Sequence, residues 1–356
     1  MIGPPALLFG VPIADSTMTE TVDLVDRFIG IGRRDGRTFQ IATPNVDFLV
    51  QAGEQPDVHR ILRNSDLNIA DGAPIVWASR ALGTPVRERV AGSDLVPRLV
   101  ERSEMTGAKV HVFGSTPDVA DRALAMMSER HPAARFTFDP GPVIADPADV
   151  DDEVLSSIVA VDADVLCVAL GNPKQERFIA AHRERLGVPV LIGVGGSLDM
   201  LTGERRRAPG WMQRAGLEWL FRAAQEPGRL GPRYAADVRV FGPRLARELR
   251  AARARRDDGG VQLESDPDVV RIVLGPSDDP ARADYDRAVG HLDGGATVRV
   301  AVTDDAALSD IAASALIGLL QRARWHGQAV DWPDTGERFT RACAALGIRP
   351  DEIAGS

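Results

Sequence analysis

The segment VLCVALGNPKQERFIAAHRERL, residues 165–186, indicates the fold class. A short apolar run leads through a glycine-containing loop into a stretch with apolar residues at helical spacing. The same alternation recurs through the first two hundred residues, where TFQIAT (38–43), VHVFG (110–114) and VPVLIGVGG (188–196) are further predicted strands. Strands that alternate with helices are typical of a parallel sheet covered by helices. We therefore predict an α/β fold, in which ligands bind beyond the carboxyl ends of the strands.

The composition is that of a globular chain with more than one domain. The 356 residues are 44% apolar and 26% charged, which is ordinary for globular proteins. The sequence contains no run of about 18 apolar residues, so no membrane-spanning helix is predicted. Residues 1–16 lack the features of a signal peptide. Cys167 and Cys343 are too few for a disulfide framework and are predicted to be buried thiols. These features predict a cytoplasmic location.

The net charge of −9 is unevenly distributed along the chain. Residues 204–256 contain 14 arginines and 5 acidic residues, whereas residues 261–356 contain 16 acidic residues and 9 arginines. A basic block within an acidic chain indicates an anionic partner, and we expect no nucleic-acid partner. The basic block also has aromatic and leucine residues at helical spacing. Its prolines, Pro227, Pro232 and Pro243, predict that it is cut into short helices.

These patterns divide the chain into four predicted segments. A parallel-sheet core occupies residues 1–203, and a basic amphipathic helical appendage occupies residues 204–250. A charged, glycine-containing linker at 251–260 leads to a small β/α domain at 261–356.

Polar residues collect in the loops that follow five predicted strands. Ser115 or Thr116 caps a predicted helix whose free backbone N–H groups suit a phosphate. The adjacent glycines Gly195 and Gly196 allow the backbone to approach a ligand closely. Each loop alone is ordinary turn chemistry, but five on one sheet edge predict a binding cleft. The loops are TPN (43–45), ADG (70–72), FGSTP (113–117), GNPKQE (171–176) and GVGGSLD (193–199).

Asp71, directly before Gly72, has two interpretations. Asp-Gly is a favoured turn pair, so the carboxylate can be a simple turn residue. Alternatively, a carboxylate at a strand end is a general base that takes a proton from an attacking hydroxyl. The six histidines are scattered, so no nearby histidine competes for the role of base, and serine-nucleophile signatures and paired Cys/His metal spacings are missing. We expect no cofactor. The Asp-x-Asp pair Asp162 and Asp164 precedes its strand and is predicted to be a loop at the opposite edge.

Several segments resemble the WecG/TagA/CpsF glycosyltransferases in unbroken order over roughly residues 5–245. The resemblance implies a Rossmann-like, membrane-associated, metal-independent and inverting enzyme on the cytoplasmic face of the membrane. Such enzymes transfer an N-acetylmannosamine-type sugar from a UDP donor to a polyprenyl-diphosphate-linked sugar in teichoic acid or surface polysaccharide synthesis. The matching segments are TPNVDFLVQA, LNIADGAPIVWASR, RVAGSDL, VHVFGS, ALGNPKQERFI, GVGGSLDMLTGERRRAPGWMQRAGLEWLFRAAQEP and RLGPRY.

The resemblance also implies roles for particular residues. Asp71 becomes the catalytic base, with Thr43 and Asn45 close to it, and Arg89 is a candidate phosphate- or acid-binding group. The implied UDP-site residues are Gly114, Gln175, Gly195, Gly196 and Asp199, and the implied diphosphate contacts are Arg222, Arg229 and Arg233.

The chemistry of the basic block fits these implied roles. Fixed guanidinium groups stabilise the charge on a departing diphosphate without a metal. The aromatic and leucine residues beside them suit an anionic membrane surface, or alternatively pack the helices onto the core. These residues are Trp211, Trp219, Leu220 and Phe221.

Residues 261–350 resemble a STAS domain, a fold that binds regulatory protein partners. The Asp-Ser-Ser-Gly phosphorylation motif of that family is reduced here to Ser314, and Ala315 replaces the glycine. Ser314 is therefore either a phosphorylation site or, more simply, a small packing residue. The domain implies a protein partner or a cover for the appendage.

Two other functions are compatible with parts of the sequence. The first is a catalytically silent nucleotide-sugar-binding scaffold, whose STAS-like domain is the active part. A silent scaffold has no physical reason to keep a base in its cleft. The second is a dinucleotide-dependent enzyme, but the first strand–helix turn lacks the Gly-x-Gly-x-x-Gly pattern. The sequence therefore favours the glycosyltransferase.

Overall fold

The structure is a computed structural model that describes residues 2–196, 208–209, 212, 221, 224–225, 227–255, 260–275, 280–302 and 308–331. The chain forms two compact units. The parallel-sheet unit comprises Thr17–Ile75 and Glu88–Val238. The hairpin unit comprises Met1–Ser16, Val76–Arg87 and Arg239–Ser356.

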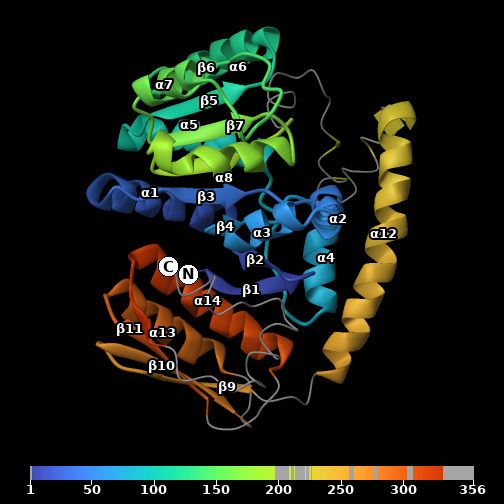
Figure 1. Ribbon diagram of the computed structural model, residues 1–356, viewed down its shortest axis with the longest axis vertical. Coiled ribbons are helices and arrows are strands. Elements are labelled where there is room, and N and C mark those ends of the chain that lie inside the picture. The colour runs from blue at the N-terminus through green and yellow to red at the C-terminus, as the bar shows by residue number, and fades with distance from the viewer. Residues whose placement is uncertain are drawn as a thin grey trace. The chain divides into compact units, whose positions relative to one another are not determined.

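The parallel-sheet unit contains a six-stranded sheet with the order β4-β3-β8-β7-β5-β6. Every neighbouring pair is parallel (Figure 1). This arrangement confirms the predicted α/β class and fits a Rossmann-like core. The strands are β3 (Phe39–Ala42), β4 (Leu67–Asn68), β5 (Val110–Gly114), β6 (Phe136–Asp139), β7 (Val165–Ala169) and β8 (Val190–Gly193).

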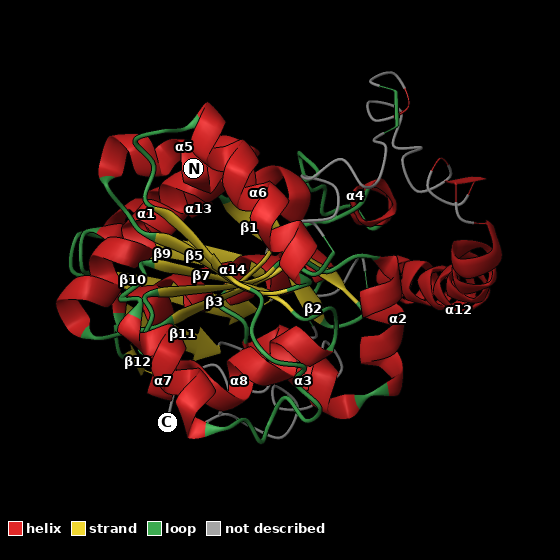
Figure 2. Ribbon diagram, turned by 90° about the horizontal axis from the view of Figure 1, so that it is seen from above, coloured by secondary structure: helices red, strands yellow, loops and turns green. Residues whose placement is uncertain are grey.

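Helices cover both faces of this sheet (Figure 2). One face carries α1 (Met18–Asp35), α5 (Gly92–Thr106) and α6 (Pro117–Arg130). The other carries α3 (Pro56–Asn64), α7 (Asp152–Ala160) and α8 (Lys174–Leu186), and α2 (Val46–Glu54) leads from β3 into α3.

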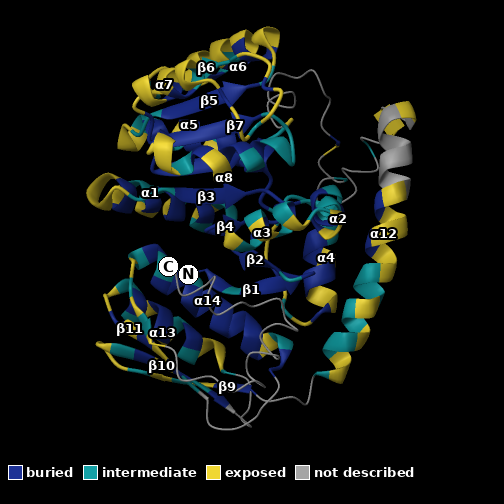
Figure 3. Ribbon diagram, in the orientation of Figure 1, coloured by how far each residue is buried: buried dark blue, intermediate teal, exposed yellow. Residues whose placement is uncertain are grey.

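Because both faces are covered, the strands are buried, except for the partly exposed edge strand β6 (Figure 3). Part of the core lies between the sheet and α8, where the rings of Phe113 and Phe178 stack with centroids 5.6 Å apart. Cys167, within β7, is fully buried as predicted, and burial raises the pKa of its thiol to about 12.

The connections of two neighbouring strands diverge at the carboxyl edge of the sheet. β5 continues into α6 on one face, whereas its neighbour β7 continues into α8 on the opposite face. Right-handed crossovers produce this divergence because β6 and β8 lie on opposite sides of the β5–β7 pair. Such a switch point is where open α/β sheets bind ligands.

The hairpin unit begins with two antiparallel strands, β1 (Gly3–Leu8) and β2 (Val11–Asp15). Phe9 and Gly10 form the turn, and both have positive φ (54° and 77°), as type I′ hairpin turns require. Residues 1–16 were predicted to belong to the core, but they pack in the hairpin unit instead. The reason is that the hairpin is buried on both faces and therefore needs cover beyond its own two strands.

That cover includes a second sheet with the order β12-β11-β10-β9. β9 is antiparallel to β10, and the other pairs are parallel. Leu7 of β1 belongs to the same apolar core as this sheet and its helices. The elements are β9 (Gly260–Ser265), β10 (Val269–Gly275), α13 (Arg282–Asp293), β11 (Thr297–Val302), α14 (Asp310–His326) and β12 (Val330–Asp331).

Helix α14 packs directly on β1 (Figure 1). The buried hydroxyl of Ser314 donates a hydrogen bond to the carbonyl oxygen of Pro5. One turn further along, a Cβ on Gly318 would lie 2.3 Å from the hydroxyl of Tyr285 and 2.9 Å from Cδ of Pro5. Ser314 and Gly318 are therefore the small residues that allow β1 and α13 to approach α14.

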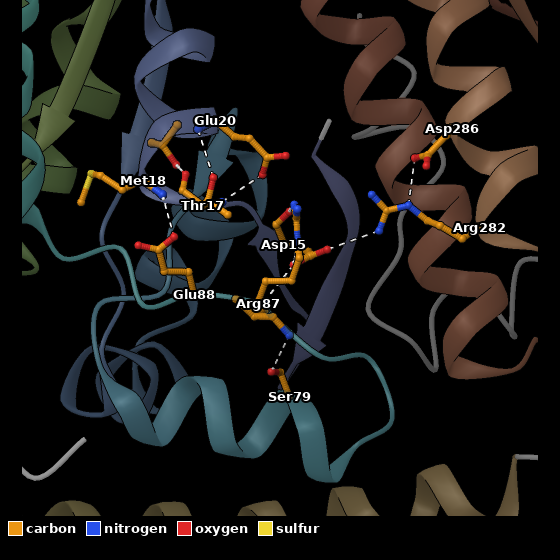
Figure 4. Close-up of polar contacts among 11 residues, drawn as sticks. Asp15, Thr17, Met18, Glu20, Ser79, Arg87, Glu88, Arg282 and Asp286 are labelled. Atoms are coloured by element: carbon orange, nitrogen blue, oxygen red, sulfur yellow. Dashed lines mark hydrogen bonds and ion pairs between the residues drawn. The ribbon is translucent and has the colours of Figure 1, made fainter. Parts of the chain in front are cut away.

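A buried carboxylate joins the end of the hairpin to two other segments of this unit. Asp15 lies 2.9 Å from the guanidinium of Arg87 and 3.5 Å from that of Arg282 at the start of α13 (Figure 4). Because the Asp15 side chain is only 6% exposed, the two cations compensate a carboxylate that would otherwise be costly to bury.

From Pro227 onward the appendage belongs to one continuous helix, α12 (Pro227–Ala254), so the prediction that Pro232 and Pro243 cut this part into short helices is wrong. Pro227 occupies its first position, where proline is favoured. The last turns are held by the β1–β2 turn, since the Phe9 N–H donates to Glu248 at 3.0 Å and Arg244 lies 4.4 Å above the Phe9 ring. These contacts help the helix to continue past Pro243, which removes one helical hydrogen bond.

The connection after α12 is shorter than the predicted linker of residues 251–260. The helix extends to Ala254, and β9 already begins at Gly260. In the part of the chain that the structure describes, no helix has the length and apolar character needed to cross a membrane.

Candidate active site

Asp71 lies in the loop that follows β4, beside the loop that follows β3. The backbone N–H of Asp71 donates to the carbonyl oxygen of Pro44 at 3.0 Å. Gly72, with φ of 148°, then turns the chain into α4 (Ala73–Ala81), a conformation that favours glycine. The structure thus brings the predicted base and the TPN loop together, with the Asp71 side chain partly exposed.

Thr43 and Asn45 hold the loop that contacts Asp71. Thr43 is buried, and its hydroxyl donates to the carbonyl oxygen of Gly193 at the end of β8, at 2.9 Å. Asn45 caps α2, because its Oδ1 accepts a hydrogen bond from the Phe48 N–H at 2.9 Å. Both side chains therefore fix the backbone next to the predicted base.

Gln175 links α8 to the turn that follows β8. Its side chain is buried, and its Oε1 accepts a hydrogen bond from the Gly195 N–H at 2.8 Å. Gly195 has a φ of 52°, and Gly196 behind it is exposed. The predicted Gly-Gly turn is thus positioned by the predicted glutamine.

Gly114, the last residue of β5, lies opposite Ala169 of β7 beside the switch point. Its φ is 102°, and a Cβ there would lie 3.0 Å from the backbone of Ala169 and from the Leu170 side chain. Thr116 is the N-cap of α6, as one alternative predicted, but its side chain makes no capping hydrogen bond. Pro173 at the start of α8 makes none either.

Two helix N-termini without a side-chain cap therefore flank the switch point. The positive end of each helix dipole is available to an anion, although in α8 the Gln175 N–H already donates to the carbonyl oxygen of Gly171 at 2.9 Å. A phosphate or diphosphate is the ligand class that such termini favour.

Arg89 lies on the segment that runs beside the Asp71 loop. The next residue, Val90, donates its N–H to the carbonyl oxygen of Ala70 at 3.0 Å. The guanidinium of Arg89 contacts Asp94 at 2.8 Å. A role for Arg89 in binding a phosphate would therefore compete with this ion pair.

The Asp-x-Asp pair lies at the opposite edge of the sheet, as predicted. Asp162 and Asp164 precede β7, and both contact Arg33, at 2.9 and 2.7 Å. The Arg33 hydrogen bond holds the pKa of Asp162 below its usual range. This pair ties α1 to the amino end of β7.

Some predicted residues are outside the described part of the chain. Asp199, Arg222, Trp211, Trp219, Leu220 and Cys343 belong to this group. Arg229 and Arg233 lie on α12, but their side chains are not described.

The sequence prediction missed Glu176, which is fully buried in the first turn of α8. Its Oε1 accepts a hydrogen bond from the Gln175 amide at 2.7 Å. Burial raises the pKa of its carboxyl to about 8. The available signal was helical spacing, since Glu176 precedes buried Ile179 by three positions. A second missed contact is the bond from Asn172 to Asp47 at 3.2 Å, which joins α2 to the loop before α8.

These contacts form a continuous row along the carboxyl edge. The Asp71 loop contacts the Thr43 loop, Thr43 contacts the end of β8, and the turn after β8 contacts Gln175 of α8. With strands about 4.8 Å apart, the row from β4 to β7 is about 14 Å long. A carboxylate lies at one end and helix N-termini lie at the other. The row therefore suits an elongated anionic ligand whose far end reacts near Asp71.

The fold is that of an α/β protein of Rossmann-like architecture, with a candidate ligand site at the switch point of its sheet. The sequence profile of the glycosyl transferase WecG/TagA/CpsF family matches residues 6–255, and the chain belongs to this family.

Curated relatives are found in Staphylococcus aureus strains MW2, NCTC 8325 / PS 47 and COL. Each is named N-acetylglucosaminyldiphosphoundecaprenol N-acetyl-beta-D-mannosaminyltransferase. Each is 28% identical to this chain over 225 residues, which covers 63% of this chain and 86% of the relative.

Proposed function

We propose that the protein transfers an N-acetylmannosamine-type sugar from a UDP donor to a polyprenyl-diphosphate-linked sugar. The observation that carries this proposal is the row of contacts along the carboxyl edge, with Asp71 at one end and two uncapped helix N-termini at the other. The names of the relatives support the choice of sugar and of the lipid-linked acceptor. Teichoic acid or surface polysaccharide synthesis is the corresponding process.

In the proposed reaction, Asp71 takes the proton of the acceptor hydroxyl. The hydroxyl oxygen attacks the anomeric carbon of the donor sugar as the bond from that carbon to the UDP phosphate oxygen breaks. The electron pair of the broken bond remains on UDP. Because this is a single displacement, the configuration at the anomeric carbon inverts.

The negative charge that develops on UDP needs fixed positive groups nearby. The N-termini of α6 and α8 supply partial positive charge. We assign further stabilisation to arginines of the basic block, with Arg222, Arg229 and Arg233 as the candidates and Asp199 as a further UDP contact. Guanidinium groups would allow the reaction to proceed without a metal.

The basic block also supports a proposal for membrane association. Its 14 arginines would bind the anionic surface that holds a polyprenyl-diphosphate acceptor. The protein would then be peripherally associated with the cytoplasmic face of the membrane.

For residues 261–356 we propose a STAS-like module that binds a protein partner. Its Ser314 is buried and donates to Pro5, so a phosphate on this hydroxyl would require β1 to leave α14. We therefore assign Ser314 a packing role.

Acceptor-dependent release of UDP tests the proposed function. The purified chain is incubated with UDP-N-acetylmannosamine, with and without a soluble polyprenyl-diphosphate-N-acetylglucosamine analogue, and UDP is quantified. We expect release only when both substrates are present, and slower release from UDP-glucose or UDP-N-acetylglucosamine. UDP binding without release from any UDP-sugar would favour the silent scaffold instead.

A further inference from the structure

Glu176 is a buried acid that the proposed reaction does not use. Its side chain is 0% exposed, and its Oε1 lies 2.4 Å from the position that a Cβ on Gly193 would occupy. The carboxyl group is therefore packed against the end of β8. Within the described part of the chain, its Oε2 has no hydrogen-bond partner. A buried acid with one unsatisfied oxygen is unfavourable for stability, so its presence calls for a reason other than packing.

The hydrogen bonds of Glu176 supply that reason. The Gln175 amide has a donor end and an acceptor end, and Glu176 Oε1 accepts from the donor Nε2 at 2.7 Å. The acceptor Oε1 of Gln175 therefore faces the Gly195 N–H, to which it is bonded at 2.8 Å. If the amide turned over, its NH₂ group would face the N–H of Gly195, and both groups would be donors.

We propose that Glu176 is a positioning residue that fixes the orientation of Gln175 and, through it, the Gly195–Gly196 turn at the donor-nucleotide end of the site. The inference rests on the proposed function, because it assigns this turn to UDP binding. Glu176 does not contact the nucleotide in this account. It acts only through Gln175.

The protonation state of Glu176 makes the role measurable. Burial raises the pKa of the carboxyl to about 8, and the hydrogen bond from Gln175 opposes this shift. The nearby charged groups are directed elsewhere, since Arg177 pairs with Asp57 of α3 at 2.8 Å and Lys174 donates to the Ile144 carbonyl. On α2, Asp47 is bonded to Asn172. Among the residues that the structure describes, no charged partner therefore compensates an ionised Glu176.

The raised pKa favours the neutral carboxyl of Glu176 in the folded protein at pH 7. Its folded pKa lies above the ordinary value of 4.5. The pH-dependent part of the free energy of unfolding due to Glu176 is therefore largest below pH 4.5. It is lost as the pH rises through about 8. Ionisation would draw water toward the carboxyl and loosen the turn, so UDP binding is expected to weaken above this pH.

Two variants of the full chain test the inference, with UDP binding measured by calorimetry at pH 7 and pH 9. Glu176→Met keeps the volume of the side chain but has no strong acceptor, and Glu176→Gln keeps an acceptor that cannot ionise. We expect Glu176→Met to weaken UDP binding about tenfold while its melting temperature is unchanged or higher, because an unsatisfied acid has been removed. Glu176→Gln is expected to bind UDP like the wild type at pH 7 and to lose less affinity at pH 9.

The outcomes separate this inference from the proposed function. If the wild type binds UDP and Glu176→Met binds it with the same affinity, the positioning role is overturned but the proposed function is not. If Glu176→Met does not fold, the pH dependence of Glu176→Gln decides, and a loss of affinity at pH 9 equal to that of the wild type would overturn the role. Failure of the wild type to bind UDP at either pH would overturn the proposed function and this inference with it.

Discussion

Asp71→Asn is expected to lower the kcat of sugar transfer at least about 100-fold, the scale that general-base catalysis contributes. The amide has nearly the same shape as the carboxylate but cannot take a proton from the acceptor hydroxyl. The backbone bond from residue 71 to Pro44 does not involve the side chain, so the loop is expected to keep its place. The affinity for UDP is therefore expected to change little, because the proposed UDP site lies nearer to α6 and α8 than to Asp71.

A matched control for this variant is Asp162→Asn. Asp162 lies at the amino end of β7, on the opposite edge of the sheet, and its side chain is 76% exposed. We expect transfer by Asp162→Asn within about twofold of the wild type, since exposed ion pairs contribute little. Initial rates of disaccharide formation at saturating donor compare the three proteins. Equal rates for Asp71→Asn and the wild type would remove Asp71 as the base while leaving the transferase in place.

Gly318→Ala is expected to destabilise the hairpin unit by about 1–3 kcal/mol, the usual cost of overpacking a core. This sign is the reverse of the general rule, since alanine in a helix is more favourable than glycine by about 1 kcal/mol. The reversal has a specific cause: a Cβ at position 318 would lie 2.3 Å from the Tyr285 hydroxyl and 2.9 Å from Pro5. Neither neighbour can move freely, because Tyr285 and Pro5 are both buried.

Gly290→Ala is the matched control for the helical background. Gly290 lies in α13, it is exposed, and a Cβ there would have nothing within 4 Å. This variant is expected to be more stable than the wild type by up to about 1 kcal/mol. Urea unfolding is followed by tryptophan fluorescence, to which buried Trp325 on α14 contributes the signal of this core. Stabilisation by both substitutions would contradict the packing of β1 and α13 on α14.

The sheet and the location of the site could be predicted from the sequence. Apolar runs that alternate with amphipathic stretches define a parallel sheet, and the carboxyl ends of parallel strands share one edge. The polar loops after these runs were therefore expected to meet, as Asp71 meets Pro44 and Gln175 meets Gly195. The opposite location of Asp162 followed from the same rule.

The partners of β1 and β2 could not be predicted in this way. A mostly apolar run indicates that a strand is buried but does not say what covers it, and here one cover, α14, lies about three hundred residues later in the chain. The continuity of α12 could not be predicted for a similar reason. The hydrogen bond from Phe9 to Glu248 joins residues that are far apart in the sequence. Glu176 was missed because charged residues are rarely fully buried, whereas this side chain and that of Gln175 both are.

The linkage made by the wild-type enzyme tests the central claim most directly. The product formed from UDP-N-acetylmannosamine, with its α-linked sugar, and the lipid-diphosphate-N-acetylglucosamine analogue would be isolated and its anomeric configuration determined by NMR. The account predicts a β-linked disaccharide, because Asp71 activates a hydroxyl for a single inverting displacement. An α-linked product, or no disaccharide although UDP binds, would contradict it.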